Sequence, residues 1–304
     1  MRTPITARTV ETLLNAALGN QMAVARYEGL CVGDSMQTVT GVAVCYAPTV
    51  SILRQAIASR QNLIIAREHP FYLHGGPFYA YTSESLLRED PVIGVGPGNS
   101  DRDMYVVDGL AGDPVVTAKR KMILDAGLVI YRYGAAWDED RPAAQSAALA
   151  RALGFTVSPE QEGRRRRCVV CDVEAGMTIA TLMTIARTQL KSGAARVVGN
   201  GGAMVRRPAV LAGESDPREA LAEMLSDPLI DCVITGAGGI SDEVDGSIAY
   251  FRDVLATGRR IVMLTVGYGP SHEPGVREMA DALRMMLPDL NVNYVPSGDP
   301  SWIA

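Results

Sequence analysis

Short apolar runs alternate with amphipathic stretches along almost the whole chain, and this alternation restricts the fold more than any other feature. Runs such as 41–47 (GVAVCYA) and 62–66 (NLIIA) are short and almost continuously apolar, as strands of a sheet buried on both faces are. Stretches such as 48–60 (PTVSILRQAIASR) place apolar residues at helical spacing. The pattern therefore predicts α/β layers built on buried, largely parallel sheets.

The order of these segments also repeats. A strand, a helix, a strand, a longer insert and a further strand follow one another in 41–133, and the same order returns in 205–267. We therefore expect two similar α/β domains that face each other across a cleft. The first covers about 1–160 and the second 161–304, with an approximate boundary and room for the domains to interleave. The expected strands are 41–47, 62–66, 127–133, 168–173, 195–200, 207–213, 231–236, 260–267 and 291–295, and the expected helices are 48–60, 115–127, 141–154, 178–193, 216–227 and 276–287.

Composition excludes several classes of protein. The 29 basic and 34 acidic residues give a net charge of −5, which disfavours a nucleic-acid surface. No apolar run reaches the roughly eighteen residues of a membrane-spanning helix, and the N-terminal residues lack the apolar core of a secretory signal. Five scattered cysteines are typical of a reducing cytoplasm rather than of a disulfide framework. Cys168 and Cys171 form a CxxC, but no second pair lies at zinc-ligand spacing, so we interpret them as partly buried strand cysteines.

Polar side chains follow several of the expected strands. In 62–76 (NLIIAREHPFYLHGG) an apolar run ends in Arg67, Glu68 and His69, and His74 follows soon after. Three other strands end in 134–138, 235–239 and 267–273, which are also rich in polar residues and glycine. Ligands of open α/β sheets bind beyond the carboxyl ends of strands, so these segments are the candidate site.

From about Val42 to the C-terminus the pattern resembles the NIF-three-like family, α/β proteins with a dinuclear metal centre between two similar domains that often form hexameric rings. The segments that carry the resemblance are 39–57, 62–72, 130–155, 196–200, 231–239 and 267–283, in the order of the family. The resemblance implies the family fold and a homo-oligomer, with a hexamer as the expected assembly.

The ligand positions that the resemblance implies are only partly kept. Glu68 and Asp138 match family ligands, whereas Arg67 stands where the family has a histidine. Tyr268 replaces a second histidine, and His272 replaces the last glutamate.

Two divalent ions need more imidazole and carboxylate ligands than this set offers. Glu68, Asp138 and His272 suffice for one zinc, manganese or iron ion, with His69 as a fourth donor. Alternatively, Arg67 replaces the metal and pairs with Asp138 or Glu68, which leaves a charged pocket without metal. One ion or none is therefore the expectation, rather than an intact dinuclear centre.

Two functions remain open on these residues. The first is a metal-dependent hydrolase with a degenerate or single-ion site and an unknown substrate, for which a nucleotide-like compound is one candidate. The second is a non-catalytic, ring-forming binding or scaffold protein that has lost the metal centre. Without a metal, the glycine-rich segments 94–98, 199–202 and 236–239 are candidate cradles for a small anionic ligand, although 94–98 reads better as a tight turn.

Simpler interpretations compete with these site roles. His74 reads as a solvent-facing loop residue, and Asp138 can instead cap a helix that starts near Arg141. The run 164–167 reads as a solvated connector or as salt bridges at a subunit contact, and phosphate binding is a distant second.

Overall fold

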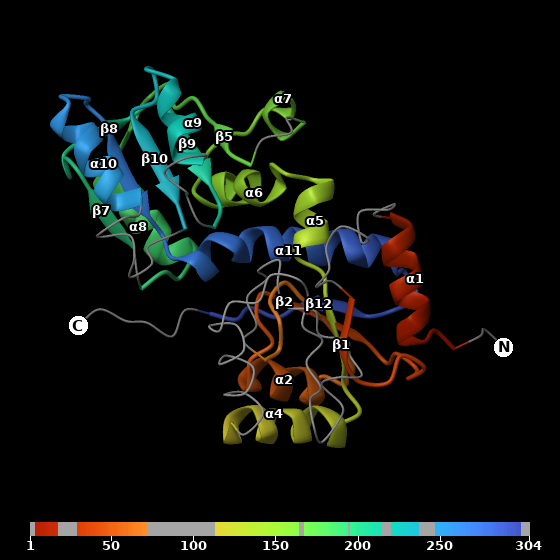
Figure 1. The fold of residues 1–304 in the computed structure, drawn as a ribbon. Coiled ribbons are helices and arrows are strands. Elements are labelled where there is room, and N and C mark those ends of the chain that lie inside the picture. Colours follow the sequence, from red (N-terminus) through yellow and green to blue (C-terminus); the bar gives the residue numbers. More distant parts are fainter. Residues whose placement is uncertain are drawn as a thin grey trace, which may run out of the picture. The chain divides into compact units, whose positions relative to one another are not determined.

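Two mixed β-sheets, each covered by helices, organise the chain in a computed structural model that describes residues 4–17, 29–71, 113–163, 167–193, 195–213, 220–236 and 247–298 (Figure 1). Unit 1 consists of Met1–Asp140 and Met279–Ser297, and unit 2 consists of Arg141–Glu278 and Gly298–Ala304. The division into domains near residue 160 stays a prediction. Within the described residues, no helix is long and apolar enough to cross a membrane.

The sheet of unit 1 has the strand order β1-β4-β3-β2-β12. Its four neighbouring strands β4, β3, β2 and β12 are parallel, and β1 pairs antiparallel with β4. The strands are β1 (Gly29–Val32), β2 (Val42–Cys45), β3 (Leu63–Ala66), β4 (Val129–Arg132) and β12 (Val292–Tyr294). Every residue of β2, β3 and β4 is buried, which explains why these runs are continuously apolar rather than alternating.

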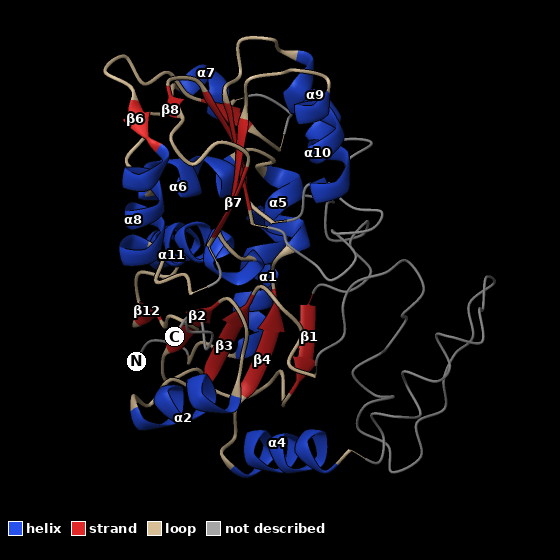
Figure 2. Ribbon diagram, turned by 90° about the vertical axis from the view of Figure 1, so that its left-hand side faces the viewer, coloured by secondary structure: helices blue, strands red, loops and turns tan. Residues whose placement is uncertain are grey.

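The helices of unit 1 begin where the sequence provides caps. Thr49 caps α2 (Val50–Ala58), and Asp113 caps α4 (Pro114–Asp125) by accepting from two backbone N–H groups. Side chains of α2 and α4 share one core with β2, β3 and β4, and Figure 2 shows both helices on the same side of this sheet. The part of unit 1 that the structure describes also contains α1 (Ala7–Ala17) and the short α5 (Ala135–Asp140).

The sheet of unit 2 has the order β5-β9-β10-β11-β7, with three parallel central strands and an antiparallel strand at each edge. Helices α6 and α8 pack on one face, and α9 and α10 pack on the other. The described elements of unit 2 are β5 (Val169–Val170), β7 (Arg196–Val198), β9 (Pro208–Leu211), β10 (Cys232–Thr235), β11 (Val262–Thr265), a small β6–β8 pair (Met177–Thr178, Met204–Val205), α6 (Ala144–Ala152), α7 (Pro159–Glu162), α8 (Ile179–Gln189), α9 (Ala220–Ser226) and α10 (Ser247–Ala256). Helix α11 (Tyr268–Met286) begins in unit 2, and its residues from Met279 onward belong to unit 1.

The repeat expected from the sequence is present in the strand topology. In unit 1 the parallel strands β2, β3 and β4 lie side by side in chain order, and in unit 2 β9, β10 and β11 do the same. An antiparallel strand flanks the third strand in both units, β1 on β4 and β7 on β11. The units differ beside the first strand, where β12 is parallel to β2 but β5 is antiparallel to β9.

Some sequence expectations were wrong in detail. The sheet of unit 2 has antiparallel edges, and the strand expected at 168–173 shrinks to Val169–Val170. Helix α11 begins at Tyr268, so the polar segment after β11 is helical and contains Pro274. Asp138 lies inside α5 and does not cap a helix at Arg141, because α6 begins only at Ala144.

The two cysteines of the CxxC are more completely buried than expected. Cys168 and Cys171 flank the short strand β5 rather than lie in it, and neither forms a disulfide. Burial raises the pKa of Cys171 to about 11, so its thiol stays protonated at neutral pH. His74, the segment 94–98 and the glycines that follow Gly236 lie outside the described residues.

Candidate functional site

The carboxyl end of β3 positions the first candidate residues. The sheet's hydrogen bonds continue past the strand, since Arg67 N donates to Cys45 O (3.1 Å) and Glu68 N donates to Tyr46 O (2.9 Å). These bonds hold the backbone of both residues on the end of β2. The neighbouring strand β4 leads through Gly134 into α5, which carries Asp138. Arg67 and Asp138 therefore come from adjacent parallel strands, at the edge where α/β sheets bind ligands.

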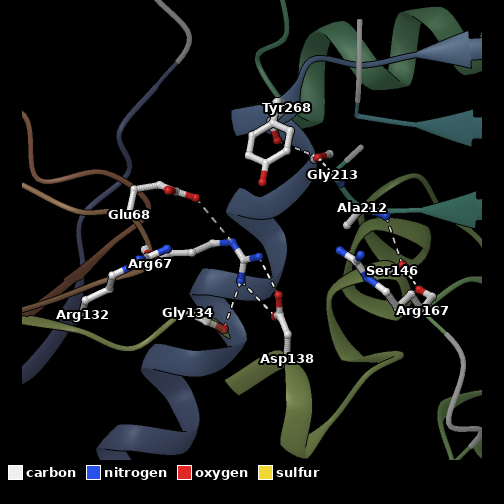
Figure 3. Close-up of polar contacts among 11 residues, drawn as sticks. Arg67, Glu68, Arg132, Gly134, Asp138, Ser146, Arg167, Ala212, Gly213 and Tyr268 are labelled. Carbon is white, nitrogen blue, oxygen red and sulfur yellow. Dashed lines mark hydrogen bonds and ion pairs between the residues drawn. The ribbon is translucent and has the colours of Figure 1, made fainter. Parts of the chain in front are cut away.

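Arg67 and Asp138 form a bidentate ion pair (Figure 3). Arg67 Nη1 donates to Asp138 Oδ1 at 2.9 Å, and Nη2 donates to Oδ2 at 2.6 Å. Glu68 Oε1 lies 4.0 Å from Arg67 Nε, so a second carboxylate flanks the same guanidinium. The Arg67 side chain is only 8% exposed, against 22% for Asp138. This planar fork-to-carboxylate geometry is the strongest form of arginine recognition, and lysine cannot reproduce it.

Gly134 makes room for this arginine. A Cβ atom at position 134 would lie 2.6 Å from the carbonyl oxygen of Arg67 and 3.0 Å from its Cγ. The first distance is shorter than any real contact of this kind, so a side chain here would push the Arg67 backbone away. Glycine at the end of β4 therefore sets the path of the guanidinium toward α5.

His69 belongs to a different environment. Its Nδ1 accepts a hydrogen bond from Phe71 N at 3.1 Å, and its ring packs edge-on against Phe71. Burial, together with the positive charges of Arg132 and Lys119, lowers the pKa of His69 to about 3. The imidazole is therefore neutral at physiological pH. Because Nδ1 accepts from the backbone, Nε2 carries the proton.

Lys119 is a buried cation of the same region. It lies on α4 and its Nζ donates to Pro70 O. Burial lowers the pKa of Lys119 to about 8, and the electrostatic interaction with Cys45 acts in the opposite direction by raising it. Arg132, the last residue of β4, donates from Nε to Arg67 O at 3.2 Å and so braces the backbone of the ion-pairing arginine.

In unit 2, the first turns of α11 dock on the ends of β9 and β10. Ser271 Oγ accepts from Gly213 N at 2.9 Å and donates to Tyr268 O at 2.6 Å. Thr235 Oγ1 donates to Gly213 O at 3.0 Å. The Ser271 oxygen thus holds the start of α11 to the end of β9, and its proton is committed to Tyr268 O within the same helix.

His272 is almost completely buried at 1% exposure, and its ring meets Tyr268 edge-on with centroids 4.9 Å apart. Gly213 permits this placement, because a Cβ atom there would lie 2.8 Å from His272 Nε2. Gly213 also has φ +81°, a conformation that glycine adopts readily. Tyr268 itself is 42% exposed.

Several solved structures match almost the whole chain, and three of them serve as examples. A Bacillus cereus protein related to NIF3 matches over 100% of both chains with a TM-score of 0.65 and 13% identity. The Staphylococcus aureus hypothetical protein SA1388 matches 99% of this chain and 100% of its own, with a TM-score of 0.64 and 15% identity. Protein YbgI, of unknown function, covers 98% of this chain and 100% of its own, with a TM-score of 0.65 and 19% identity.

The chain has the NIF3 fold. No family model matches it, and no curated protein matches it in sequence. At identities of 13–19%, these likenesses show the fold alone. They confirm the fold that the segments from Val42 onward predicted.

Within the NIF3 fold, the candidate residues fall into two groups. Arg67, Glu68 and Asp138 meet in unit 1, whereas Tyr268 and His272 meet in unit 2. Across the described ranges, no three His, Cys, Asp or Glu side chains gather as a metal-binding cluster. The metal roles of Glu68, Asp138, His272 and His69 stay predictions.

The donors of unit 1 do not fit a divalent cation in this arrangement. Both oxygens of Asp138 accept from Arg67, and Glu68 lies beside the same positive guanidinium. His69 Nδ1 is occupied by Phe71 N. A cation at Asp138 would have to displace Arg67 and would meet its positive charge at close range.

Sequence reasoning gave no role to Arg132 and Lys119, and it named Gly134 only as part of the candidate segment 134–138. Lys119 carried a signal, because it falls between Val116 and Ile123 on the stripe of α4 that faces the core. A charged residue on such a stripe indicates a buried cation rather than a solvated one. Arg132 ends an otherwise apolar strand, which is the same signal that drew attention to Arg67.

Proposed function

We propose that this chain is a non-catalytic binding or scaffold protein of the NIF3 fold, in which a guanidinium–carboxylate pair stands where a metal centre is expected from the resemblance. The observation that carries the proposal is the bidentate contact between Arg67 and Asp138. The chain retains the carboxylates but uses them to hold an arginine.

The energetics support this assignment. A metal-dependent hydrolase with one zinc, manganese or iron ion needs Asp138 as a ligand, and Asp138 is available only if Arg67 releases it. Release would leave a guanidinium that is 8% exposed without its main partner. Breaking a buried pair in this way costs about 3–5 kcal/mol. A metal at this position must overcome that cost in addition to the repulsion from Arg67.

Metal content tests the proposal. We expect protein purified without chelator to contain far less than one equivalent of zinc, manganese or iron per chain by elemental analysis. We also expect no saturable Mn²⁺ or Zn²⁺ binding by calorimetry. One tightly bound equivalent that disappears in Asp138→Ala would support the hydrolase instead. Glu139→Ala removes an exposed carboxylate from the same helix and serves as the control.

The proposed assembly is a homo-oligomeric ring of six chains, an expectation that rests on the resemblance. Light scattering coupled to size-exclusion chromatography measures it directly. With 32.5 kDa per chain, we expect a mass six times that of the chain. The mass of a monomer at micromolar protein concentration would contradict the hexameric ring. It would not bear on the proposal that the site binds no metal.

A further inference from the structure

A four-residue segment that follows β3, Arg67–Pro70, is held at both ends by buried cations from other elements. At its first residue, Arg132 Nε of β4 donates to Arg67 O at 3.2 Å. At its last residue, Lys119 Nζ of α4 donates to Pro70 O. Lys119 is 3% exposed and Arg132 is 9% exposed. Two positive charges are therefore fixed beside one short stretch of backbone at the carboxyl end of β3.

His69 lies between these two attachment points and responds to both charges. Arg132 and Lys119 both lower the pKa of His69, in addition to the larger effect of burial. Because Nδ1 of the ring accepts from Phe71 N, the neutral imidazole presents an N–H at Nε2. The segment thus brings together an imidazole N–H, an ammonium and a guanidinium, and all three groups donate hydrogen bonds.

The carboxylates of this region face a different cation. Glu68 Oε1 lies 4.0 Å from Nε of Arg67, and Asp138 accepts from both terminal nitrogens of that arginine. Burying a cation is unfavourable, and burial accordingly lowers the pKa of Lys119 to about 8. A negative charge bound beside Lys119 would reduce this cost through charge-assisted hydrogen bonds.

We infer that Lys119, Arg132 and His69 form a binding site for a small oxyanion, with a phosphate group as the first candidate. Buried cations and N–H donors on one segment are the groups that recognise such anions. The site lies at the edge where α/β sheets bind ligands. The inference rests on the proposed function and deepens it, because it names the class of ligand that a binding protein without metal would hold in unit 1.

Inorganic phosphate is the first probe. The melting temperature of the full chain is compared in sodium phosphate and in sodium chloride of equal ionic strength, both at pH 7, where Lys119 is mostly protonated. Both buffers contain EDTA, so that a bound metal cannot hold the phosphate. At a phosphate concentration ten times the dissociation constant, we expect a rise on the order of 3 °C. Calorimetry should give one phosphate per chain.

Substitutions at the two cations make the outcome specific. Lys119→Met and Arg132→Met remove one charge each and should weaken phosphate binding by at least about tenfold. Lys119→Arg keeps the charge and should retain most of the response, whereas a role in packing alone would not separate it from Lys119→Met. Lys121→Met is the matched control, because Lys121 lies on the same helix with a side chain that is 75% exposed. It should bind phosphate as the unaltered chain does.

A second probe distinguishes a free anion from one carried by a larger ligand. AMP is titrated in the same way as inorganic phosphate. Tighter binding of AMP would identify the phosphate group of a nucleotide, and weaker binding would identify a free oxyanion. In both cases Lys119→Met should weaken the binding that is observed.

An unaltered chain that responds alike to phosphate and chloride, with no binding by calorimetry, would overturn the inference. Phosphate binding of unchanged strength in folded Lys119→Met and Arg132→Met would also overturn it, because the anion would then be held elsewhere. Neither result bears on the metal content of the unaltered chain. Conversely, a metal bound by the unaltered chain would refute the proposed function and is detected separately by elemental analysis.

Discussion

Asp138→Ala should lower the free energy of unfolding by about 3 kcal/mol, because it leaves the Arg67 guanidinium in place without the carboxylate that accepts from both of its terminal nitrogens. We take the lower end of the range for buried pairs, since the Asp138 side chain is 22% exposed and water can partly solvate the gap. Urea unfolding, followed by circular dichroism, measures the change.

A double-mutant cycle separates the ion pair from simple truncation. Arg67→Met combined with Asp138→Ala removes both charges, and we expect it to recover a large part of the stability lost in Asp138→Ala alone. Asp138→Asn keeps the size of the side chain but not its charge and should fall between the two. Glu139→Ala should change stability by no more than about 0.5 kcal/mol. If the double variant is as unstable as the sum of the single variants, the two residues do not act as a pair.

The second large effect is expected at Gly236, at the end of β10. A Cβ atom there would lie 2.2 Å from Ser271 Oγ, 2.7 Å from Ser271 Cβ and 2.9 Å from the carbonyl oxygen of Gly213. The last of these neighbours is backbone and cannot rotate away. Gly236→Ala should therefore force α11 away from the sheet and lower the free energy of unfolding by about 2–3 kcal/mol.

Gly201→Ala is the matched control, because nothing lies within 4 Å of a Cβ atom at that position. It should be neutral within about 0.5 kcal/mol. A second variant tests whether Ser271 causes the clash. Ser271→Gly removes two of the three close atoms and should recover part of the free energy of unfolding that Gly236→Ala loses. Equal stability of Gly236→Ala and Gly201→Ala would show that the packing of α11 on β10 is looser than these distances indicate.

Most strands could be predicted from the sequence because they are buried on both faces. The runs 41–47, 62–66 and 231–236 contain β2, β3 and β10, and their unbroken apolar character distinguishes them from the surrounding helices. The edge strand β1 was not predicted, because Gly29–Val32 is short and pairs along one side only. Short edge strands carry little pattern of their own, since their position is set by the strand they join.

The start of α11 could not be predicted for a different reason. The segment from Gly267 to Gly275 contains two prolines and three glycines, which usually indicates a loop. Tertiary contacts outweigh this local preference, since Ser271 bonds Gly213 and His272 is buried. Pro270 lies in the first turn, where its missing N–H costs nothing.

The sequence predicted two alternatives for the candidate site, a metal ion or an arginine–carboxylate pair, but it did not allow a choice between them. The sequence places Arg67, Glu68 and Asp138 at strand ends and permits either an ion or an arginine pair. Spacing along the chain does not reveal which carboxylate the guanidinium reaches. That choice depends on Gly134, whose lack of a side chain matters only once β3 and β4 lie side by side.

The pairing of β12 with β2 determines when the sheet of unit 1 can be completed during synthesis. Strand β12 pairs with β2 in parallel, although about 250 residues separate the two strands along the chain, and it belongs to the returning segment Met279–Ser297. The first sheet therefore cannot be completed until β12 has left the ribosome, after all of Arg141–Glu278 has emerged. Until then β2 presents an open edge of backbone N–H and carbonyl groups, on which another nascent chain can add a strand.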